Sequence, residues 1–270
     1  MKSLVERYGP WALVAGASEG IGAAFATALA EAGFSLVLIA RRAAPLDALA
    51  EDLRKRFGKN VEVHAVDLGN ADLEARVQAI AASHEIGLLV YNAALSIVAP
   101  FLETSLADKQ RILDVNARGP MICAHVLGEQ MAARGRGGIV LLSSLTAFWG
   151  SAWVATYGAT KAFNLSLGEA LAHEMAESGV DVVVSCAGAT RTPNFVNLLR
   201  GRKGPSAMSP EDVARETLAA LPNRGGFVPG RFNRFAQFML TRLMPRRLAI
   251  RVMAGQTRGL LEYAKKGNDP

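Results

Sequence analysis

The sequence predicts an α/β protein with a doubly wound parallel sheet, in which helices cover both faces and make three layers, α/β/α. Short apolar runs rich in β-branched residues or leucine recur along the chain, and longer amphipathic stretches separate them. Strands that alternate with helices build βαβ units, whose parallel strands are buried on both faces. Because such crossovers are right-handed, the helices are distributed over both faces of one sheet. The length of 270 residues suits a single domain.

Each apolar run is an expected strand, and the stretches between the runs are expected helices. The strands are residues 11–16, 35–40, 61–66, 87–92, 138–144, 180–186 and 226–230. The helices are residues 21–32, 45–57, 71–83, 106–133 and 160–178. A further helix should begin at Pro210, with Ser209 as its N-cap. Glycine, proline, serine and charge cluster at residues 200–209, which predicts a mobile loop.

Composition excludes several classes of protein. The chain is 50% hydrophobic, which is typical of a globular protein rather than a disordered one. It has no apolar run long enough to span a membrane, and its first residues lack the apolar segment of a secretory signal. We therefore expect a cytoplasmic protein. Cys123 and Cys186 lack metal-ligand spacing and are expected to be reduced and buried, and no metal site is expected.

The positive charge is concentrated near the C-terminus. Residues 191–270 carry 15 basic and 5 acidic side chains, a net of +10, whereas the first 190 residues have a net charge of −4. Residues 231–270 are expected to form a helical extension that is not an independent domain, broken at Pro245. One face of its first helix would be apolar and another would carry arginines. The apolar residues are Phe232, Phe235, Ala236, Met239, Leu240 and Leu243, and the arginines are Arg231, Arg234 and Arg242.

Three roles remain open for this extension: packing on the core, a subunit contact, or peripheral contact with an anionic membrane surface that delivers lipid-soluble substrate. Nucleic-acid binding is not expected, because no aromatic platform or reading motif accompanies the charge.

A glycine-rich turn, AGASEGIG at residues 15–22, follows the first expected strand and opens the first expected helix. Gly16, Gly20 and Gly22 would permit a tight turn, close approach of a pyrophosphate, and a helix N-terminus whose N–H groups receive negative charge. The alternative is a glycine-rich turn with no ligand. The position at the first crossover favours a dinucleotide site.

The end of the second strand indicates which dinucleotide binds. An acid there would accept from a ribose 2′-OH, but this strand runs into Arg41 and Arg42, which suit a 2′-phosphate. We therefore expect NADP, with NAD less favoured; a solvated arginine pair is the alternative. Ser18 would add a hydroxyl, whereas Glu19 would disfavour the phosphate if it pointed inward. Asp67, after the third strand, would accept from an adenine amino group or cap the next helix.

A serine, a tyrosine and a lysine have the spacing needed for carbonyl reduction. Ser144 ends the fifth strand, 13 residues before Tyr157, and Lys161 stands one helical turn beyond Tyr157. Tyr157 would protonate the forming alkoxide, and the Lys161 ammonium would lower the pKa of Tyr157. Ser144 would hold the substrate oxygen. Asn116 would hold a water that relays protons to Lys161.

The chain resembles the short-chain dehydrogenase/reductase family over about residues 10–230. The resemblance rests on AGASEGIG, YNAA (91–94), Asn116, Ser144, YGATK and AGATRTP (187–193), in this order. It implies a Rossmann-type catalytic domain over residues 1–230 and a catalytic tetrad of Asn116, Ser144, Tyr157 and Lys161. It also implies that Lys161 contacts the nicotinamide ribose, that Thr192 contacts the carboxamide, and that the protein is a homodimer or homotetramer paired through residues 105–133 and 158–178.

The sequence departs from the family pattern at Ala15, Tyr91, Ala94 and Ala187, where threonine, asparagine, glycine and proline are usual. These changes bear on cofactor affinity more than on the type of reaction. The candidate cofactor-binding residues are Gly16, Ser18, Gly20, Ile21, Gly22, Arg41, Arg42, Asp67, Leu68, Asn92, Ala93, Tyr157, Lys161, Gly188 and Thr192.

The substrate side is expected to be apolar, because large side chains cluster near the tyrosine and in the loop beyond residue 189. The candidates are Leu145, Trp149, Trp153, Val154, Phe195, Val196 and Leu198; the alternative is that two or three of them pack in the core. The hypothesis is an NADP(H)-dependent oxidoreductase for an apolar carbonyl or alcohol, such as a steroid, fatty acyl or aromatic ketone. The alternative is a non-catalytic dinucleotide-binding regulatory protein or a membrane-surface scaffold.

Overall fold

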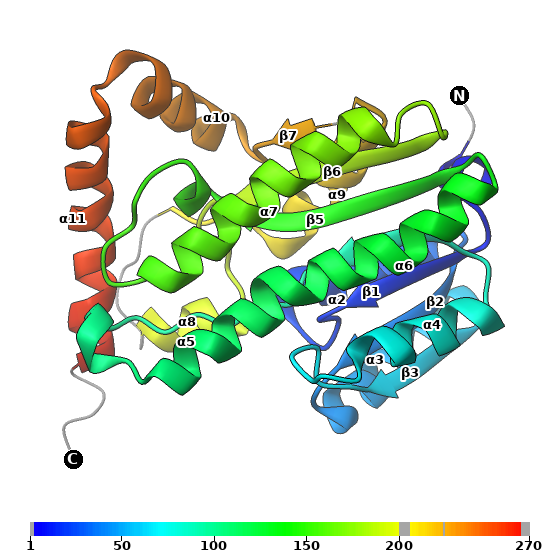
Figure 1. Cartoon of the computed structure of the whole chain (residues 1–270). Helices are drawn as coiled ribbons and strands as arrows, with labels where there is room; N and C mark the ends of the chain where they lie inside the picture. Colours follow the sequence, from blue (N-terminus) through cyan, green and yellow to red (C-terminus); the bar gives the residue numbers. More distant parts are fainter. Residues whose placement is uncertain (1–2, 200–205, 224, 266–270) are drawn as a thin grey trace.

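The computed structural model describes residues 3–199, 206–223 and 225–265. Its centre is a seven-stranded sheet in the order β3-β2-β1-β4-β5-β6-β7, with every neighbouring pair parallel. The strands are β1 (Trp11–Ala15), β2 (Ser35–Ala40), β3 (Val61–Ala65), β4 (Ile86–Tyr91), β5 (Gly137–Ser144), β6 (Val180–Ala187) and β7 (Gly225–Phe227). The predicted doubly wound sheet is confirmed, and its order reverses between β1 and β4 (Figure 1).

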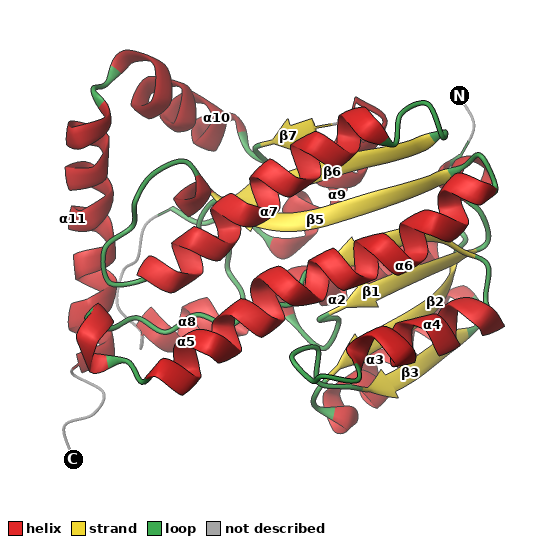
Figure 2. Cartoon of the chain, viewed as in Figure 1, coloured by secondary structure: helices red, strands yellow, loops and turns green. Residues whose placement is uncertain are grey.

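Helices cover both faces of the sheet, as Figure 2 shows. They are α1 (Leu4–Tyr8), α2 (Gly20–Glu31), α3 (Ala43–Phe57), α4 (Leu73–Ser83), α5 (Leu106–Leu113), α6 (Gly119–Ala133), α7 (Ala155–Glu174), α8 (Pro193–Leu199), α9 (Pro210–Ala220), α10 (Arg231–Phe238) and α11 (Arg246–Lys265). Alternate residues of β1 enter two cores. Ala12 and Val14 face α2, α3 and α9, whereas Leu13 and Ala15 face α4, α6 and α7.

The N-terminal helix α1 was not expected from the sequence. A capping box starts it, in which the Ser3 hydroxyl and the Glu6 side chain each accept a backbone N–H. The helix is tied to the body through Asp181, a buried residue of β6. Arg7 donates to Asp181 at 2.6 Å, and the Tyr8 hydroxyl donates to it at 3.0 Å.

The helix expected over residues 106–133 contains a π-helical turn, Asp114–Arg118. The extra residue in such a turn redirects the side chains after it, and π turns often occur at functional sites. Here the turn carries Asn116, which is completely buried. The Tyr91 hydroxyl, at the end of β4, donates to the Val115 carbonyl at 2.7 Å and so fixes the turn against the sheet.

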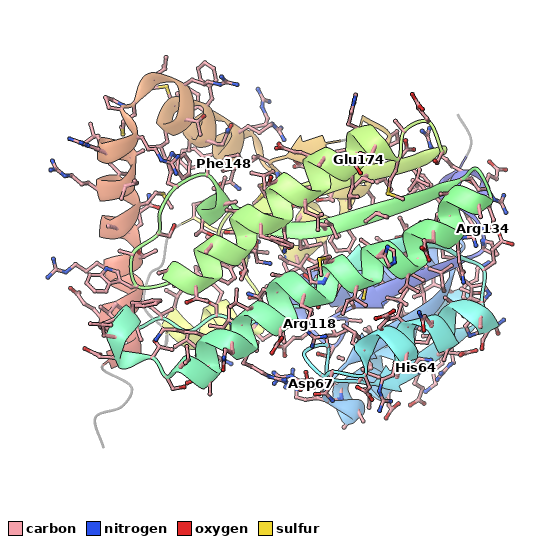
Figure 3. The ribbon with its side chains drawn as sticks, in the orientation of Figure 1. His64, Asp67, Arg118, Arg134, Phe148 and Glu174 are labelled. Carbon is pink, nitrogen blue, oxygen red and sulfur yellow. The ribbon has the colours of Figure 1, made fainter. Side chains whose placement is uncertain are left out.

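The C-terminal extension wraps around one end of the molecule, with α10 and α11 at an angle to each other (Figure 1). Pro245 lies between them, as expected. α11 packs on the loop after β5, where Trp149 is buried with Ala249 and Met253. Arg246 donates to the carbonyl of Phe148, which is labelled in Figure 3, at 3.1 Å. The division into a catalytic domain and an extension stays a prediction.

Two further expectations concerned the cysteines and the loop at residues 200–209. Cys123 and Cys186 are unpaired and buried, as expected. The mobile loop expected at 200–209 falls largely on residues 200–205, which lie outside the described residues.

Helix α7 approaches β6 closely at Gly168. A Cβ added to Gly168 would lie 2.2 Å from Cγ2 of Val184 in β6, well inside van der Waals contact. A glycine at this position therefore lets the backbone of α7 approach β6. Near its start the same helix carries Tyr157 and Lys161.

We expect Gly168→Ala to lower the free energy of unfolding by about 1–3 kcal/mol, because the new methyl group must push α7 away from β6. Urea unfolding followed by circular dichroism measures this. The matched control is Gly158→Ala in the same helix, where the nearest atom would be 3.5 Å from the new Cβ. The control should be neutral or stabilising, because alanine is the better helix former. Equal losses in both variants would contradict the close-approach argument.

Candidate active site

The glycine turn lies where β1 and β4 end side by side. Gly16 has φ of 83°, and a Cβ there would lie 2.6 Å from the backbone nitrogen of Ala93. At Gly22 a Cβ would lie 2.0 Å from the Gly16 carbonyl oxygen. The Asn92 amide donates to that same oxygen at 2.9 Å. Only glycines allow the two loops to touch in this way, and the contact forms the floor of a cavity.

The N-terminus of α2 faces this cavity without a side-chain cap. Glu19 occupies the N-cap position but makes no capping hydrogen bond. Gly20 has φ of 58°, and a Cβ there would lie 2.9 Å from Cγ2 of Thr192. Uncapped N–H groups at a helix N-terminus suit an anion, and the bare glycine backbone admits a bulky phosphate group. The turn therefore fits the pyrophosphate of a dinucleotide.

The cavity has a volume of about 730 Å³ and lies at the carboxyl ends of the strands. It is lined by every predicted catalytic and cofactor-binding residue except Gly22, which lies beneath the turn, and Asn116. Ala94 and Ala187, two of the departures from the family pattern, also line it. Sequence reasoning had not singled out the lining residues Leu95, Ser96, Thr190 and Asn194. Thr190 lies within the AGATRTP segment, and the other three follow directly after that segment or after YNAA.

The polar end of the cavity holds two ion pairs. Arg42 donates to Glu19 at 2.6 Å, while Arg41 lines the cavity beside it. Asp67 accepts the Gly69 N–H at 2.9 Å and an ion pair from Arg111. Burial alone would raise the pKa of Asp67, but the Gly69 N–H and the Arg111 guanidinium lower it by more. The pKa is therefore below its usual value, and the carboxylate stays ionised.

Two roles were expected for Asp67, accepting a hydrogen bond from an adenine amino group or capping the next helix. It does not cap α4, whose N-cap is Asp72, and it lies at the cavity wall near Arg118 (Figure 3). This position is compatible with the adenine contact expected from the sequence.

Helix α7 brings the tyrosine and the lysine to the end of β5. The Lys161 ammonium is buried and donates to the Leu142 carbonyl at 2.8 Å. The Ser143 hydroxyl donates to the Lys161 carbonyl at 2.7 Å. The Lys161 nitrogen lies 5.5 Å from the centre of the Tyr157 ring. Tyr157, Lys161 and Ser144 all line the cavity, so the structure brings the three residues together.

Protonation of these groups is governed by burial. Burial raises the pKa of Tyr157, and a hydrogen bond with Ser144 lowers it, with a net increase. This result corrects the expectation that Lys161 lowers the pKa of Tyr157: burial outweighs any attraction, and the ammonium points to the Leu142 carbonyl. Burial also lowers the pKa of Lys161 to about 8. The phenol is therefore protonated at neutral pH, and most of the lysine is charged.

Asn116 acts on the cavity through its neighbours. Its amide oxygen accepts the Leu95 N–H at 2.7 Å, and its amide nitrogen donates to the Leu95 carbonyl at 2.8 Å. It also donates to the Thr160 hydroxyl at 3.2 Å, on α7. Leu95 lines the cavity, so Asn116 joins the loop after β4 to the helix that carries Tyr157.

The predicted apolar residues do not form one pocket. Among them only Phe195 lines the main cavity, while Trp153 and Val154 line a small hollow next to Tyr157. Trp149 is instead buried against α11, and Leu145 packs on the core. Val196 is exposed, and the side chain of Leu198 lies outside the described residues. The contacts of α11 with the loop after β5 explain Trp149, and no local sequence pattern indicated them.

Comparison with known proteins agrees with this geometry. The profile described as "short chain dehydrogenase" matches residues 10–203. The chain belongs to the short-chain dehydrogenase family. A 7beta-hydroxysteroid dehydrogenase from Collinsella aerofaciens is 32% identical to it over 237 residues, covering 86% of this chain and 90% of that protein.

Solved structures are similar to this short-chain dehydrogenase over most of its length. A structure of a 7beta-hydroxysteroid dehydrogenase superposes with a TM-score of 0.88 at 30% identity, covering 93% of this chain and 99% of that one. A short-chain dehydrogenase from Sphingobium yanoikuyae in complex with NADPH superposes with a TM-score of 0.76 at 29% identity, covering 87% and 94%. This short-chain dehydrogenase is accordingly an oxidoreductase that acts on CH–OH and C=O groups.

The buried Lys161 predicts a pH dependence of stability. Its ordinary pKa of 10.5 applies to the unfolded chain, and its pKa in the folded protein is about 8. Below pH 8 the buried lysine is charged in the folded protein, and the cost of burying this charge lowers the free energy of unfolding. Between the two pKa values the unfolded chain binds more protons than the folded protein, so the free energy of unfolding increases as the pH rises. Relative to Lys161→Met, the free energy of unfolding of the wild type should increase by up to about 3 kcal/mol between pH 7.5 and 10.

Urea unfolding of both proteins at several pH values measures this difference. Lys55→Met, which removes an exposed lysine, serves as the control and should follow the wild type closely. Parallel curves for wild type and Lys161→Met would contradict the burial of the ammonium.

Proposed function

We propose that this short-chain dehydrogenase is an NADP(H)-dependent oxidoreductase for an apolar carbonyl or alcohol, with Tyr157 as the general acid and base. One observation carries the proposal: Ser144, Tyr157 and Lys161 line the same cavity as the glycine turn and the Arg41–Arg42 pair. A binding module would not need a protonated phenol beside a phosphate-binding turn, which disfavours the non-catalytic alternative.

The proposed chemistry assigns a separate task to each side chain. NADPH, when bound, would supply the hydride for the carbonyl carbon. Ser144 holds the substrate oxygen by a hydrogen bond, and Tyr157 donates its proton to that oxygen. The phenol is protonated at neutral pH, the state needed for donation, and burial raises its pKa above the usual value. Lys161 holds the start of α7, and with it Tyr157, at the end of β5 through its hydrogen bond to the Leu142 carbonyl. Asn116 positions the loop after β4 and would hold the water that relays protons to Lys161.

Charge and similarity support the cofactor and the substrate class. Arg41 and Arg42 offer guanidinium groups for a 2′-phosphate at the end of β2, and a related structure was solved with NADPH. Phe195 in the cavity and Trp153 in the adjoining hollow favour an apolar substrate. A relative that acts on a hydroxysteroid is consistent with this class.

We further propose a cytoplasmic homodimer or homotetramer. Exposed apolar side chains on α5, α6 and α7 favour a subunit contact across these helices. They are Leu106, Leu113, Met121 and Phe163.

Tyr157→Phe should reduce turnover by at least about a thousandfold, because the proton donor is lost while the ring remains. Oxidation of NADPH with a panel of steroid, fatty acyl and aromatic ketones measures turnover, and quenching of protein fluorescence measures NADPH binding. Binding should stay within a few-fold of the wild type. A Phe variant with unchanged turnover would reject Tyr157 as the acid, and no activity of the wild type on any ketone would favour the binding-protein alternative.

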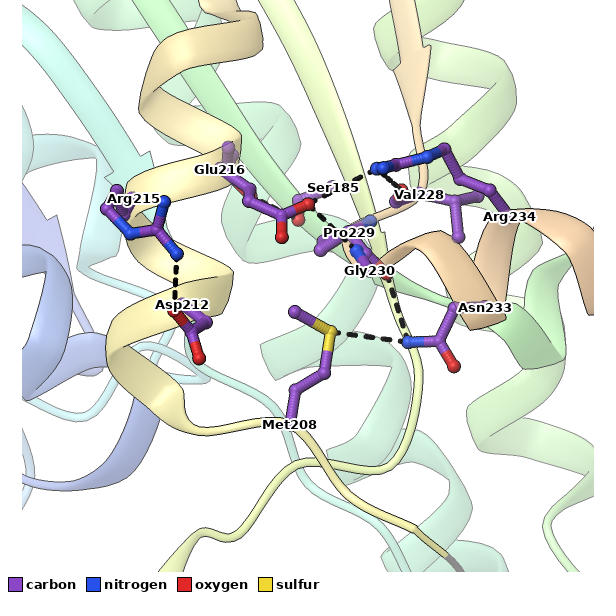
Figure 4. A network of polar contacts seen from close by, with 11 residues as sticks. Ser185, Met208, Asp212, Arg215, Glu216, Val228, Pro229, Gly230, Asn233 and Arg234 are labelled. Atoms are coloured by element: carbon purple, nitrogen blue, oxygen red, sulfur yellow. Dashed lines mark hydrogen bonds and ion pairs between the residues drawn. The ribbon is translucent and has the colours of Figure 1, made fainter.

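A second proposal concerns the C-terminal extension: we infer that α10 and the start of α11 bind an anionic membrane surface. Not one residue of α10 is buried, although the helix has a distinct apolar face. Phe232 and Phe235 are 74% and 62% exposed. Polar contacts hold its first turn, where Glu216 of α9 accepts the Gly230 N–H at 2.9 Å and Arg234 at 3.2 Å (Figure 4). The helix is thus held in place while its apolar face is open.

Charge on the same extension favours lipid as the partner. The exposed arginines of α10, α11 and the turn between them are Arg231, Arg234, Arg242, Arg246, Arg247, Arg251 and Arg258. The exposed apolar residues are Phe232, Phe235, Phe238, Met239, Leu243, Leu248 and Val252. An apolar face flanked by arginines is typical of a helix that lies in the headgroup region of anionic lipid. Among the described helices, none is long and apolar enough to cross a membrane.

The wild type should sediment with vesicles of phosphatidylglycerol and much less with phosphatidylcholine. The double variant Phe232→Ser and Phe235→Ser should bind the anionic vesicles at least about tenfold more weakly, because two rings leave the bilayer. Leu102→Ser is the matched control, since Leu102 is 92% exposed outside the extension. Equal vesicle binding by the double variant and the control would reject the proposal. So would an effect of the double variant on the oligomeric state alone.

A further inference from the structure

We propose that Glu19 sets the preference between NADP and NAD by holding Arg42, and thereby weakens the recognition of a 2′-phosphate. The inference rests on the proposed dinucleotide site. It concerns a residue of the glycine turn whose carboxylate faces the cation that would receive that phosphate.

In the glycine turn the Glu19 side chain points to Arg42 rather than to the N-terminus of α2. Glu19 is the N-cap residue of α2, with an extended backbone, yet its carboxylate accepts no N–H from the helix. The carboxylate instead pairs with Arg42 at 2.6 Å, across the mouth of the cavity. Both residues line the cavity, so their ion pair lies on its wall.

The two arginines at the end of β2 are therefore not equivalent. Arg42 already has an anionic partner from the protein. Arg41 makes no side-chain hydrogen bond or ion pair with the residues that the structure describes, and its charge lowers the pKa of Asp67 from a distance. A 2′-phosphate would meet one open guanidinium and one that it must take from Glu19. It would also approach the Glu19 carboxylate, which repels it.

The same carboxylate suits the other cofactor. A ribose 2′-OH is recognised by an acid near the end of the second strand, which accepts its hydrogen bond. Here the acid comes from the glycine turn rather than from the strand. Glu19 thus opposes the 2′-phosphate of NADP and tolerates the 2′-hydroxyl of NAD, while Arg41 acts in the opposite sense.

The exposure of the two side chains sets the size of the expected change in affinity for a 2′-phosphate. The side chains of Glu19 and Arg42 are 43% and 58% exposed, so solvent weakens their attraction. Replacing Glu19 by glutamine should raise the affinity for a 2′-phosphate about three- to tenfold, the range of a solvent-exposed charge contact.

The test compares two fragments that differ at the 2′ position, adenosine 2′,5′-bisphosphate and 5′-AMP, by isothermal titration calorimetry on the full chain at one low ionic strength. In Glu19→Gln the affinity for the bisphosphate should rise about three- to tenfold, and that for 5′-AMP should change less than about twofold. Glu51→Gln is the matched control: it removes the same charge from an exposed pair with Lys55, on α3. It should leave both affinities unchanged.

A double-mutant cycle with Arg42→Gln tests the mechanism. If Glu19 acts by holding Arg42, the gain from Glu19→Gln should be mostly lost when Arg42 is absent. The inference is overturned if Glu19→Gln leaves the ratio of the two affinities unchanged, if Glu51→Gln changes it equally, or if the full gain persists without Arg42. Failure of the bisphosphate and 5′-AMP to bind any variant would reject the dinucleotide site itself, and with it the proposed function.

Discussion

The close approach of α7 to β5 and β6 holds Tyr157, Lys161 and Ser144 together at one wall of the cavity. Gly168 lets the helix backbone reach Val184, and Lys161 and Ser143 join helix and strand by hydrogen bonds in both directions. A longer side chain at the glycine would move the start of the helix away from the end of β5. Tyr157 and Ser144 could then no longer reach one oxygen atom.

The same principle operates at the glycine turn, where backbone meets backbone without side chains between. Gly16 and Gly22 allow the loops after β1 and β4 to touch, and Asn92 closes the contact with a hydrogen bond to the Gly16 carbonyl. Asn116, from the π-helical turn, binds the loop after β4 from its other side. Both loops are thus held by polar contacts to rigid elements, which preorganises the cavity wall.

The C-terminal extension has two faces with different tasks. Its inner face, through Ala249 and Met253, buries Trp149 and so fixes the loop between Ser144 and Tyr157. Its outer face leaves Phe232 and Phe235 open beside arginines. The proposed lipid-binding surface is therefore joined by direct packing to the loop between Ser144 and Tyr157, which suits the proposed class of apolar substrates.

The parallel sheet, the glycine turn and the serine, tyrosine and lysine could be predicted from the sequence, because they depend on period, spacing and residue type within short segments. Features that depend on contacts between distant segments could not be predicted in this way. Only folding pairs Glu19 with Arg42, buries Trp149 against α11 and places Asn116 on Leu95. It also reversed the expected shift in the pKa of Tyr157, because burial is a property of the whole fold and leaves no pattern in the local sequence.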